Sequence, residues 1–275
     1  MKRRIIYSSN VIIAVWVIRF LDGSLHKEYV LERYKDSKPV SVPDFKMKPV
    51  KFEENSALKK LVRYDRLDKT HPAYEFITRR KIPEEHLDKL FFCPKFYKWV
   101  NGIIPKKLPT KNDHPRVIIP FYDRSGKFFA FQGRAFGQEQ PKYVTIKLDD
   151  SKEKIYGLDR LDLNKPVYVT EGPIDSLFLD NCIAMAGADI SLKIPSDQCT
   201  MIFDNEPRNE QIVNRMINAV HKNYKVVIFP ESLKYKDIND MVIHKNEVGD
   251  VSKLIYNNRQ NGLAALQSIN KWKRI

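Results

Sequence analysis

From residue 166 onward, short apolar runs alternate with polar and helical segments, and this alternation constrains the fold more than any other feature of the chain. The apolar runs are PVYVT, IAMAG, CTMIFD and KVVIF. Between the last two lies NEQIVNRMINAVHKN, whose apolar residues recur at helical spacing from Ile212 to Val220. Short buried strands that alternate with helices predict an α/β unit with a mainly parallel sheet, closed by C-terminal helices.

Acidic residues come directly after three of these predicted strands. Glu171 follows PVYVT, Asp204 ends CTMIFD, and Asp237 follows KVVIF by eight residues. Glu206 and Asp240 extend the second and third of these clusters. Because ligands bind beyond the carboxyl ends of parallel strands, we expect the acids to meet at one rim of the sheet.

A cluster of carboxylates at one rim predicts a metal site. Close carboxylates repel one another and raise each other's pKa unless a cation neutralises them. Oxygen ligands without His or Cys favour Mg²⁺ or Mn²⁺ over zinc, and two such ions can activate a hydroxyl and stabilise a leaving pyrophosphate. Singly, each acid has a simpler explanation: Asp204 as a helix N-cap, or Asp175 as a charge in the first turn of a helix.

Upstream of residue 160 the pattern is different. Helices are predicted at AYEFITRR and IPEEHLDKL, followed by a β-hairpin at RVIIPFYD and KFFAFQGRAF and a strand at 143–147. A short helix at SLHKEYVLERYK and an extended linker precede them. The aromatic cluster between Phe91 and Trp99 fits either base stacking or core packing, and core packing is favoured.

The positive charge of the chain is concentrated in its first part. The formal net charge is +14, of which +11 falls in residues 1–110, +3 in 111–160 and none in 161–275. This asymmetry predicts that the basic first part of the chain binds a polyanion and that the neutral second part carries out a reaction on it. A soluble protein that is merely basic is the alternative.

Cysteine spacing and the N-terminal sequence indicate a cytoplasmic protein. Cys93, Cys182 and Cys199 lie far apart, so neither a zinc ribbon nor a disulfide framework is encoded. The apolar run VIIAVWVI near the N-terminus is too short to span a membrane and lacks a signal-peptide cleavage site. We therefore expect no zinc in this chain and no membrane partner.

The order of the motifs resembles the catalytic core of DnaG-type DNA primases with its TOPRIM domain. EGPID, FDNEP and KDINDMV are similar to the TOPRIM acidic motifs, and RVIIPFYDRSGKFFAFQGRAF, PKYVTI and IYGLDRL resemble the basic half of that core. The amino-acid sequences of the acidic motifs most resemble those of the primases of T-even-like bacteriophages. The resemblance covers about residues 65–275.

The resemblance implies roles for the acids. Glu171 would be the leading catalytic acid, as metal ligand or general base, with Asp204 and Glu206 as metal ligands, Asp237 as the third acidic position and Asp175 in support. Two positions depart from the family pattern: Glu206 replaces the usual second Asp, and Asn239 replaces another, which leaves the role of Asp240 open.

The resemblance also implies a set of basic residues that hold the template or the triphosphate. These are Arg116, Arg134 and Lys142, with Lys154 or Lys152 as a looser match. Solvated strand edges are the simpler explanation for isolated lysines such as Lys127 and Lys147.

The expected layout has four parts. Residues 1–64 would be the end of a zinc domain, without its ligands, plus a linker; 65–160 the basic α+β lobe; 161–248 the TOPRIM domain; and 249–275 a helical segment. A zinc domain on another polypeptide, or a truncated or diverged form, would explain the missing ligands.

The resemblance implies a DNA-dependent RNA primase core that joins ribonucleoside triphosphates on single-stranded DNA beside a replicative helicase. Mg²⁺ or Mn²⁺ on the TOPRIM acids would be its cofactor, and a phage-encoded form would act in the host cytoplasm. Two alternatives stay open: a TOPRIM-type nuclease, and a non-catalytic subunit that binds single-stranded DNA or the helicase.

Overall fold

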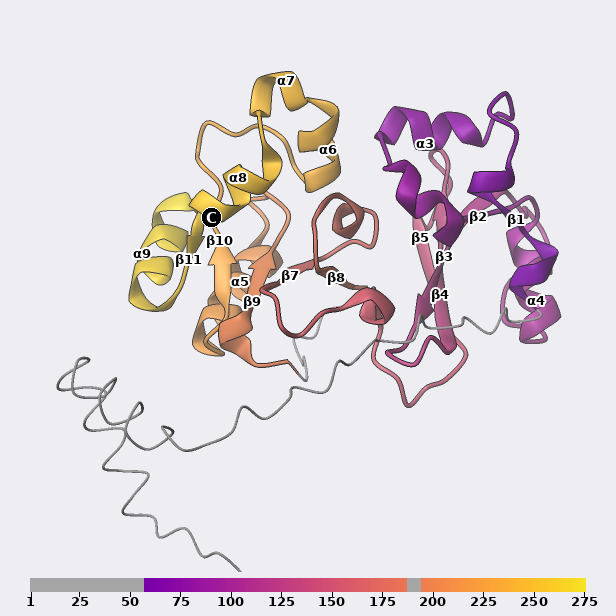
Figure 1. Cartoon of the computed structure of the whole chain (residues 1–275), viewed down its shortest axis with the longest axis horizontal. Coiled ribbons are helices and arrows are strands. Elements are labelled where there is room, and N and C mark those ends of the chain that lie inside the picture. Colours follow the sequence, from indigo (N-terminus) through magenta and orange to yellow (C-terminus); the bar gives the residue numbers. More distant parts are fainter. Residues whose placement is uncertain (1–56, 187–193) are drawn as a thin grey trace, which may run out of the picture. The chain divides into compact units, whose positions relative to one another are not determined.

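The computed structural model describes residues 57–186 and 194–275 (Figure 1). The chain divides into two compact units, residues 1–48 and 49–275, and every described residue belongs to the second. The N-terminal apolar run, the helix predicted at SLHKEYVLERYK and the predicted remnant of a zinc domain lie outside the described residues, as does most of the predicted linker.

The first sheet is antiparallel, with strand order β1-β2-β3-β4-β5. Its strands are β1 (Val62–Arg63), β2 (Phe91–Cys93), β3 (Arg116–Tyr122), β4 (Phe128–Ala135) and β5 (Tyr143–Lys147). The predicted β3–β4 hairpin and the strand at 143–147 are confirmed. Gly126 closes the hairpin with a φ of 81°, a conformation that costs glycine little.

Both faces of the first sheet are buried. Every residue of β4 is buried, and along β3 the side chains alternate between two clusters. Val117 and Ile119 pack with helix α3 (Tyr74–Arg80), whereas Ile118 packs with helix α4 (Phe96–Ile103). Since Phe96 is fully buried in the second cluster, the aromatic segment serves core packing, as favoured from the sequence.

The second sheet is mixed, with strand order β11-β10-β9-β7-β8-β6. Its strands are β6 (Ile155–Tyr156), β7 (Val167–Thr170), β8 (Cys182–Met185), β9 (Cys199–Ile202), β10 (Lys225–Val227) and β11 (Arg259–Gln260). The inner strands β10, β9, β7 and β8 run parallel, and β6 and β11 pair antiparallel at the edges. The predicted mainly parallel sheet is therefore confirmed.

Helices cover the second sheet on both faces. Helices α5 (Glu210–His221) and α9 (Gly262–Trp272) pack in one cluster with the alternate β7 residues Val167 and Val169 (Figure 1). The other face is covered by α6 (Ile238–Ile243) and α8 (Val251–Asn257), with α7 (Lys245–Val248) between them in the chain. Burial on both faces explains why these strands are continuous apolar runs in the sequence.

Strand order places a switch point between β7 and β9. The chain goes from β7 to its neighbour β8, returns to β9 on the other side of β7, and continues outward to β10. Connections therefore leave β7 and β9 toward opposite sides, which opens a crevice beyond their carboxyl ends. Glu171 and Asp204 follow these two strands.

Two segments expected to be α-helical form 3₁₀ turns instead, at Glu84–Lys89 and Asp175–Phe178. A 3₁₀ turn has three residues per turn, so residues three apart lie on one side. Leu87 and Leu90 are both buried, as are Ile174 and Leu177, and the tighter turn suits this spacing.

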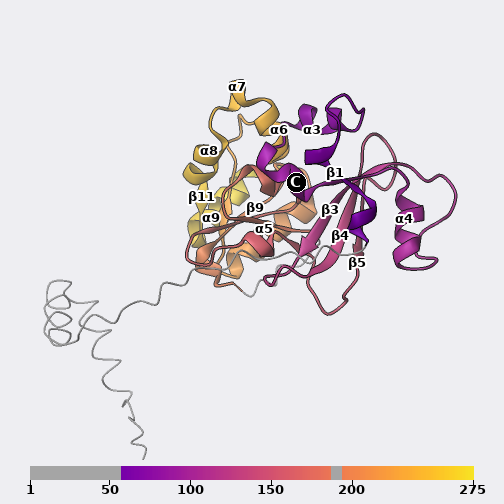
Figure 2. The ribbon, with the colours of Figure 1, turned by 45° about the vertical axis from the view of Figure 1, so that its right-hand side comes forward.

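The two sheets share one apolar cluster. It includes Phe121 of β3 and Tyr156 of β6, whose ring centres lie 5.4 Å apart. Helix α3 contacts helix α6 across the same junction (Figure 2). Within the described ranges, no helix is long and apolar enough to cross a lipid bilayer.

Candidate functional site

Four carboxylates meet beyond the carboxyl ends of β7 and β9. Glu171, Asp175, Asp204 and Asp237 line one cavity of about 10 Å³ whose other walls are mainly apolar. The segments that carry them are far apart in the sequence, and the switch point between β7 and β9 brings them together.

Glu171 joins the two central strands. Its Oε2 accepts a hydrogen bond from the backbone N–H of Asp204 at 3.0 Å, and its Oε1 pairs with the Arg215 guanidinium from helix α5. Arg215 also stacks on Phe203, with 5.4 Å from its guanidinium carbon to the ring centre. Both carboxylate oxygens of Glu171 are thus held in place.

The acids of the cavity have raised pKa values. Burial, with repulsion from Asp237 and Asp204, raises the pKa of Asp175 to about 8, although a hydrogen bond from the backbone N–H of Asn239 (3.0 Å) opposes the shift. Burial and repulsion from Glu171 raise the pKa of Asp204 to about 7. Burial also raises the pKa of Asp237. Such groups favour a proton or a bound cation over bare negative charge.

Lys236 is the counter-ion of the second acidic cluster. Its Nζ lies 2.8 Å from Glu206 Oε1 and 3.6 Å from Asp204 Oδ2. The hydrogen bond lowers the pKa of Glu206 and raises that of Lys236. An ammonium group therefore bridges two of the predicted metal ligands.

Asp237 serves as a helix N-cap, whereas Asp204 does not cap helix α5. Helix α5 is capped by Asn209, whose Oδ1 accepts from Gln211 N at 3.1 Å, so Asp204 is not the cap of this helix. Asp237 caps α6 by accepting from Asp240 N at 2.8 Å and also lines the cavity. The Asp240 carboxylate is absent from the walls of this cavity.

The carboxylate oxygens of this site are suitable ligands for a hard cation such as Mg²⁺, but in this structure they form ion pairs with arginine and lysine side chains. Among the described residues, no three His, Cys, Asp or Glu side chains are arranged to hold an ion as they stand. Arg215 pairs with Glu171, and Lys236 with Asp204 and Glu206. Carboxylate oxygens are nevertheless the ligands that Mg²⁺ and Mn²⁺ prefer, and the exposed Lys236 occupies the position of a counter-ion between Asp204 and Glu206.

Asn239 ties the site to helix α3. It is 1% exposed, and its Nδ2 donates to the backbone carbonyl of Arg80 at 2.7 Å while its Oδ1 accepts from the Arg80 guanidinium. Lys81 Nζ adds a bond to the carbonyl of Ile243 at 2.8 Å. The residue that departs from the family pattern therefore connects the two sheets.

Arg116 is not placed to contact nucleic acid. It is fully buried, and its guanidinium donates to the carbonyls of Gly133 (2.9 Å), Pro141 (2.7 Å) and Lys142 (3.3 Å). The side chain thus holds the loop that carries Lys142, and a phosphate contact by Arg116 stays a prediction that this burial does not favour. Lys152 is likewise engaged, 3.0 Å from Asp123, whereas Lys154 is exposed.

Arg134 and Lys142 form a positive cluster with Arg80. Arg134 is 3% exposed and lies 4.7 Å from the ring centre of Tyr143. Lys142 is exposed, but partial desolvation of its ammonium group, together with repulsion from Arg134 and Arg80, lowers its pKa. The negative charge of Asp237 raises the pKa of the same lysine, so the positive cluster lies close enough to the acids to interact with them. Mutually repelling cations of this kind favour a bound anion.

Arg80, Arg215 and Lys236 were missed from the sequence. Lys236 directly precedes Asp237, which was a usable signal. Arg215 sits beside the apolar face of α5, where an unexplained cation also points to a buried partner. Arg80 gives no local signal, since its partner is 159 positions away.

Comparisons with known proteins agree with this geometry. No protein-family model matches the sequence. The DNA primase of Enterobacteria phage T4 is 33% identical over 266 residues, which cover 94% of this chain and 78% of the phage protein.

Solved structures share the fold. A DNA primase domain from Pseudomonas aeruginosa superposes with a TM-score of 0.55 at 19% identity, covering 74% of this chain and 77% of that one. The RNA polymerase domain of Mycobacterium tuberculosis primase DnaG, in complex with a double-stranded DNA oligomer with a 6-nucleotide overhang, gives 0.55 at 14% identity, covering 78% and 80%. The fold is that of DnaG primase catalytic cores. Because the phage relative matches along nearly the whole chain, this protein belongs to the DNA primase family and is an enzyme of that family.

Proposed function

We propose that this primase joins ribonucleotides into short RNA primers on single-stranded DNA by divalent-metal-dependent nucleotidyl transfer, with its reaction centre at the four-carboxylate cavity. The observation that carries the proposal is the convergence of Glu171, Asp204 and Asp237 at the switch point between β7 and β9. An acid pKa raised to about 7, as for Asp204, indicates a group poised to exchange a proton for a cation.

In the reaction, the 3′-oxygen of one nucleotide bonds to the α-phosphorus of another, and the bond to the leaving pyrophosphate breaks. Glu171 accepts the hydroxyl proton or helps to bind the cation, and Arg215 with the Asp204 N–H fixes its orientation. Mg²⁺ or Mn²⁺ bound by Glu171, Asp204 and Glu206 would lower the hydroxyl pKa and neutralise the leaving group. Asp175 and Asp237 support the site from the second side of the cavity.

The positive cluster of Arg80, Arg134 and Lys142 would hold the triphosphate or the template backbone opposite the acids. The electrostatic action of Asp237 on Lys142 supports this placement. Single-stranded DNA and ribonucleoside triphosphates are the proposed ligands, with Lys154 as an outer template contact. A replicative helicase is the proposed protein partner, on the strength of the family resemblance.

We also retain the domain layout as a proposal: a basic lobe at 65–160, a TOPRIM domain at 161–248 and a helical segment at 249–275, after the linker and zinc-domain end at 1–64. The order of the two sheets supports the division, since β2 to β5 lie within 65–160 and β7 to β10 lie within 161–248. Two edge strands depart from it: β1 of the first sheet lies before residue 65, and β6 of the second sheet lies before residue 161.

The test is primer synthesis with single-stranded template, ribonucleoside triphosphates and Mg²⁺ or Mn²⁺, with helicase present. Glu171→Ala and Asp204→Ala are expected to lose about 10²–10⁴-fold in rate. Asp180→Ala, an exposed acid, is the matched control.

Unchanged synthesis by either site variant would refute the assigned centre. Metal-dependent cleavage of DNA without nucleotides would instead favour a nuclease. Salt-dependent DNA binding without any product would favour a non-catalytic subunit.

A further inference from the structure

Arg160 lies next to the turn that connects the acids Glu171 and Asp175, yet it takes no part in the reaction proposed above. It ends the 3₁₀ turn Leu158–Arg160, which follows β6. The two acids line the four-carboxylate cavity, whereas Arg160 lines a separate pocket of about 650 Å³. Any influence of this arginine on the reaction centre must therefore pass through the turn.

The guanidinium of Arg160 is fixed by β6 and β8. Its Nη2 donates to the backbone carbonyl of Cys182, the first residue of β8, at 3.0 Å. The guanidinium carbon lies 4.6 Å from the ring centre of Tyr156 in β6. A Cβ on Gly157, whose φ is 89°, would lie 2.9 Å from both the guanidinium carbon and Nη2. Glycine at this position therefore leaves the room that the arginine needs.

Ser176 connects the arginine to the turn. Arg160 Nη2 carries two hydrogens, and besides Cys182 it donates to Ser176 Oγ at 3.0 Å. Ser176 is 1% exposed, and its hydroxyl donates onward to the carbonyl of Pro173 at 2.7 Å. A single buried hydroxyl thus accepts from the arginine and donates to the backbone of the turn, so Arg160 holds this turn against β8.

The same turn places both acids. Glu171 directly precedes it, and Asp175 is the neighbour of Ser176 in the chain. A Cβ on Gly172 would lie 2.7 Å from Asp175 Oδ2, so this carboxylate packs against the backbone of the residue that follows Glu171. Asp175 Oδ1 accepts from the backbone N–H of Asn239 at 3.0 Å. A shift of the turn would therefore move both acids relative to α6.

We infer that Arg160 is a positioning residue for the reaction centre: fixed on β8, it holds, through Ser176, the turn that presents Glu171 and Asp175 to a divalent cation. The inference rests on the proposed function, because it requires that these acids bind the cation. Groups that orient the ligands of a metal ion are worth about 10–100-fold in metal affinity. The effect here should lie at the lower end, since Asn239 still holds Asp175 when the arginine is lost.

The test is binding of Mn²⁺ to the full chain without nucleotide or DNA, followed by the electron paramagnetic resonance signal of the free ion. Ser176→Ala removes the hydroxyl between the arginine and the turn, and should weaken Mn²⁺ binding about tenfold. Arg160→Ala should weaken it by a similar factor. The double variant should bind no more weakly than Arg160→Ala alone, because both changes break one connection.

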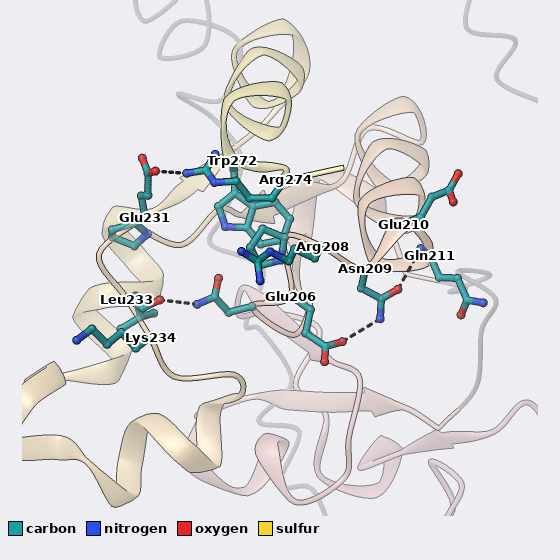
Figure 3. Close-up of a pocket in the computed structure, with 13 residues that line it drawn as sticks. Glu206, Arg208, Asn209, Glu210, Gln211, Glu231, Leu233, Lys234, Trp272 and Arg274 are labelled. Carbon is teal, nitrogen blue, oxygen red and sulfur yellow. Dashed lines mark hydrogen bonds and ion pairs between the residues drawn. The ribbon is translucent and has the colours of Figure 1, made fainter.

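Two control variants separate positioning from a general loss of stability. Arg274→Ala removes another arginine that pairs with a side chain, Glu231, in a pocket that shares no residue with the turn (Figure 3). Asn101→Ala removes both hydrogen bonds between this side chain and the backbone of Leu108, so it should lower the melting temperature. Both variants should bind Mn²⁺ as tightly as the wild type.

Unchanged Mn²⁺ affinity in Ser176→Ala and Arg160→Ala, or a double variant whose loss is the sum of the single losses, would overturn the inference. Glu171→Ala and Asp204→Ala distinguish it from the proposed function. If these two variants bind Mn²⁺ as tightly as the wild type, the proposed function fails together with the inference. If they bind it weakly while Ser176→Ala binds it normally, only the positioning role of Arg160 fails.

Discussion

Asn239 and Arg80 bind each other reciprocally: the Asn239 amide donates to the Arg80 carbonyl, and the Arg80 guanidinium donates to the Asn239 amide oxygen. The backbone N–H of the same asparagine holds Asp175. One buried side chain thus fixes helix α3 against the acidic cavity, and an aspartate at this position would add negative charge beside Asp175.

Asn239→Ala is expected to lower the free energy of unfolding by about 1–3 kcal/mol, because it leaves the Arg80 groups without partners. Urea denaturation measures the loss. Primer synthesis should fall further than stability alone explains, since Asp175 and Arg80 lose their mutual placement. The exposed Asn214→Ala on α5 is the control, and a variant as stable and active as that control would contradict the connection.

The acidic cavity predicts an inverted pH dependence of stability in the absence of metal. Asp204 and Asp175 have folded pKa values raised to about 7 and about 8, above the ordinary value of 3.8. Between these limits the folded state binds more protons than the unfolded state, so stability falls as the pH rises from about 4 to about 8.

In EDTA, the melting temperature should therefore decrease across this pH range, and Asp204→Asn should flatten part of the slope. Added Mg²⁺ should oppose the decrease, because it replaces the proton as counter-charge. The exposed Asp180→Asn is the control. A melting temperature that rises steadily with pH in EDTA would contradict the raised pKa values.

Lys236→Ala tests whether this lysine stands in for a metal ion. The side chain is half exposed, so its removal should cost less than about 1 kcal/mol of stability in EDTA. Mg²⁺ should then raise the melting temperature of the variant more than that of the wild type, because the ammonium no longer competes for Asp204 and Glu206. Equal metal-induced shifts in both proteins would exclude the competition.

Arg116→Ala and Lys142→Ala should separate structure from binding. Arg116→Ala removes the guanidinium that donates to the carbonyls of Gly133 and Pro141 and opens a cavity, so unfolding should become easier by about 2–4 kcal/mol. Lys142→Ala should leave stability unchanged but weaken binding to single-stranded DNA, with the slope of log K against log salt reduced by about 0.7. Equal effects of both variants on stability and on binding would contradict this separation.

The sequence was sufficient for features set by local pattern. The parallel inner strands of the second sheet, helix α5, the β3–β4 hairpin and the strand Tyr143–Lys147 follow from periodicity, and the strand-end acids Glu171, Asp204 and Asp237 line one cavity as expected. The antiparallel edge strands β6 and β11 were not predicted. Long-range pairing was not predictable. Arg116 lies in an apolar run that gives no sign of the loop carbonyls it binds, and the partners of Asn239 and Glu171 depend on how α3 and α5 pack.

Three of the four sheet edges are formed by strands of only two residues, β1, β6 and β11. Such short edges offer a second molecule few free backbone groups with which to extend the sheet. The remaining edge, β5, follows Pro141 and carries Lys142 and Lys147 around it. Concentrated samples are therefore expected to resist strand-to-strand association through these edges, which light scattering at increasing protein concentration would measure.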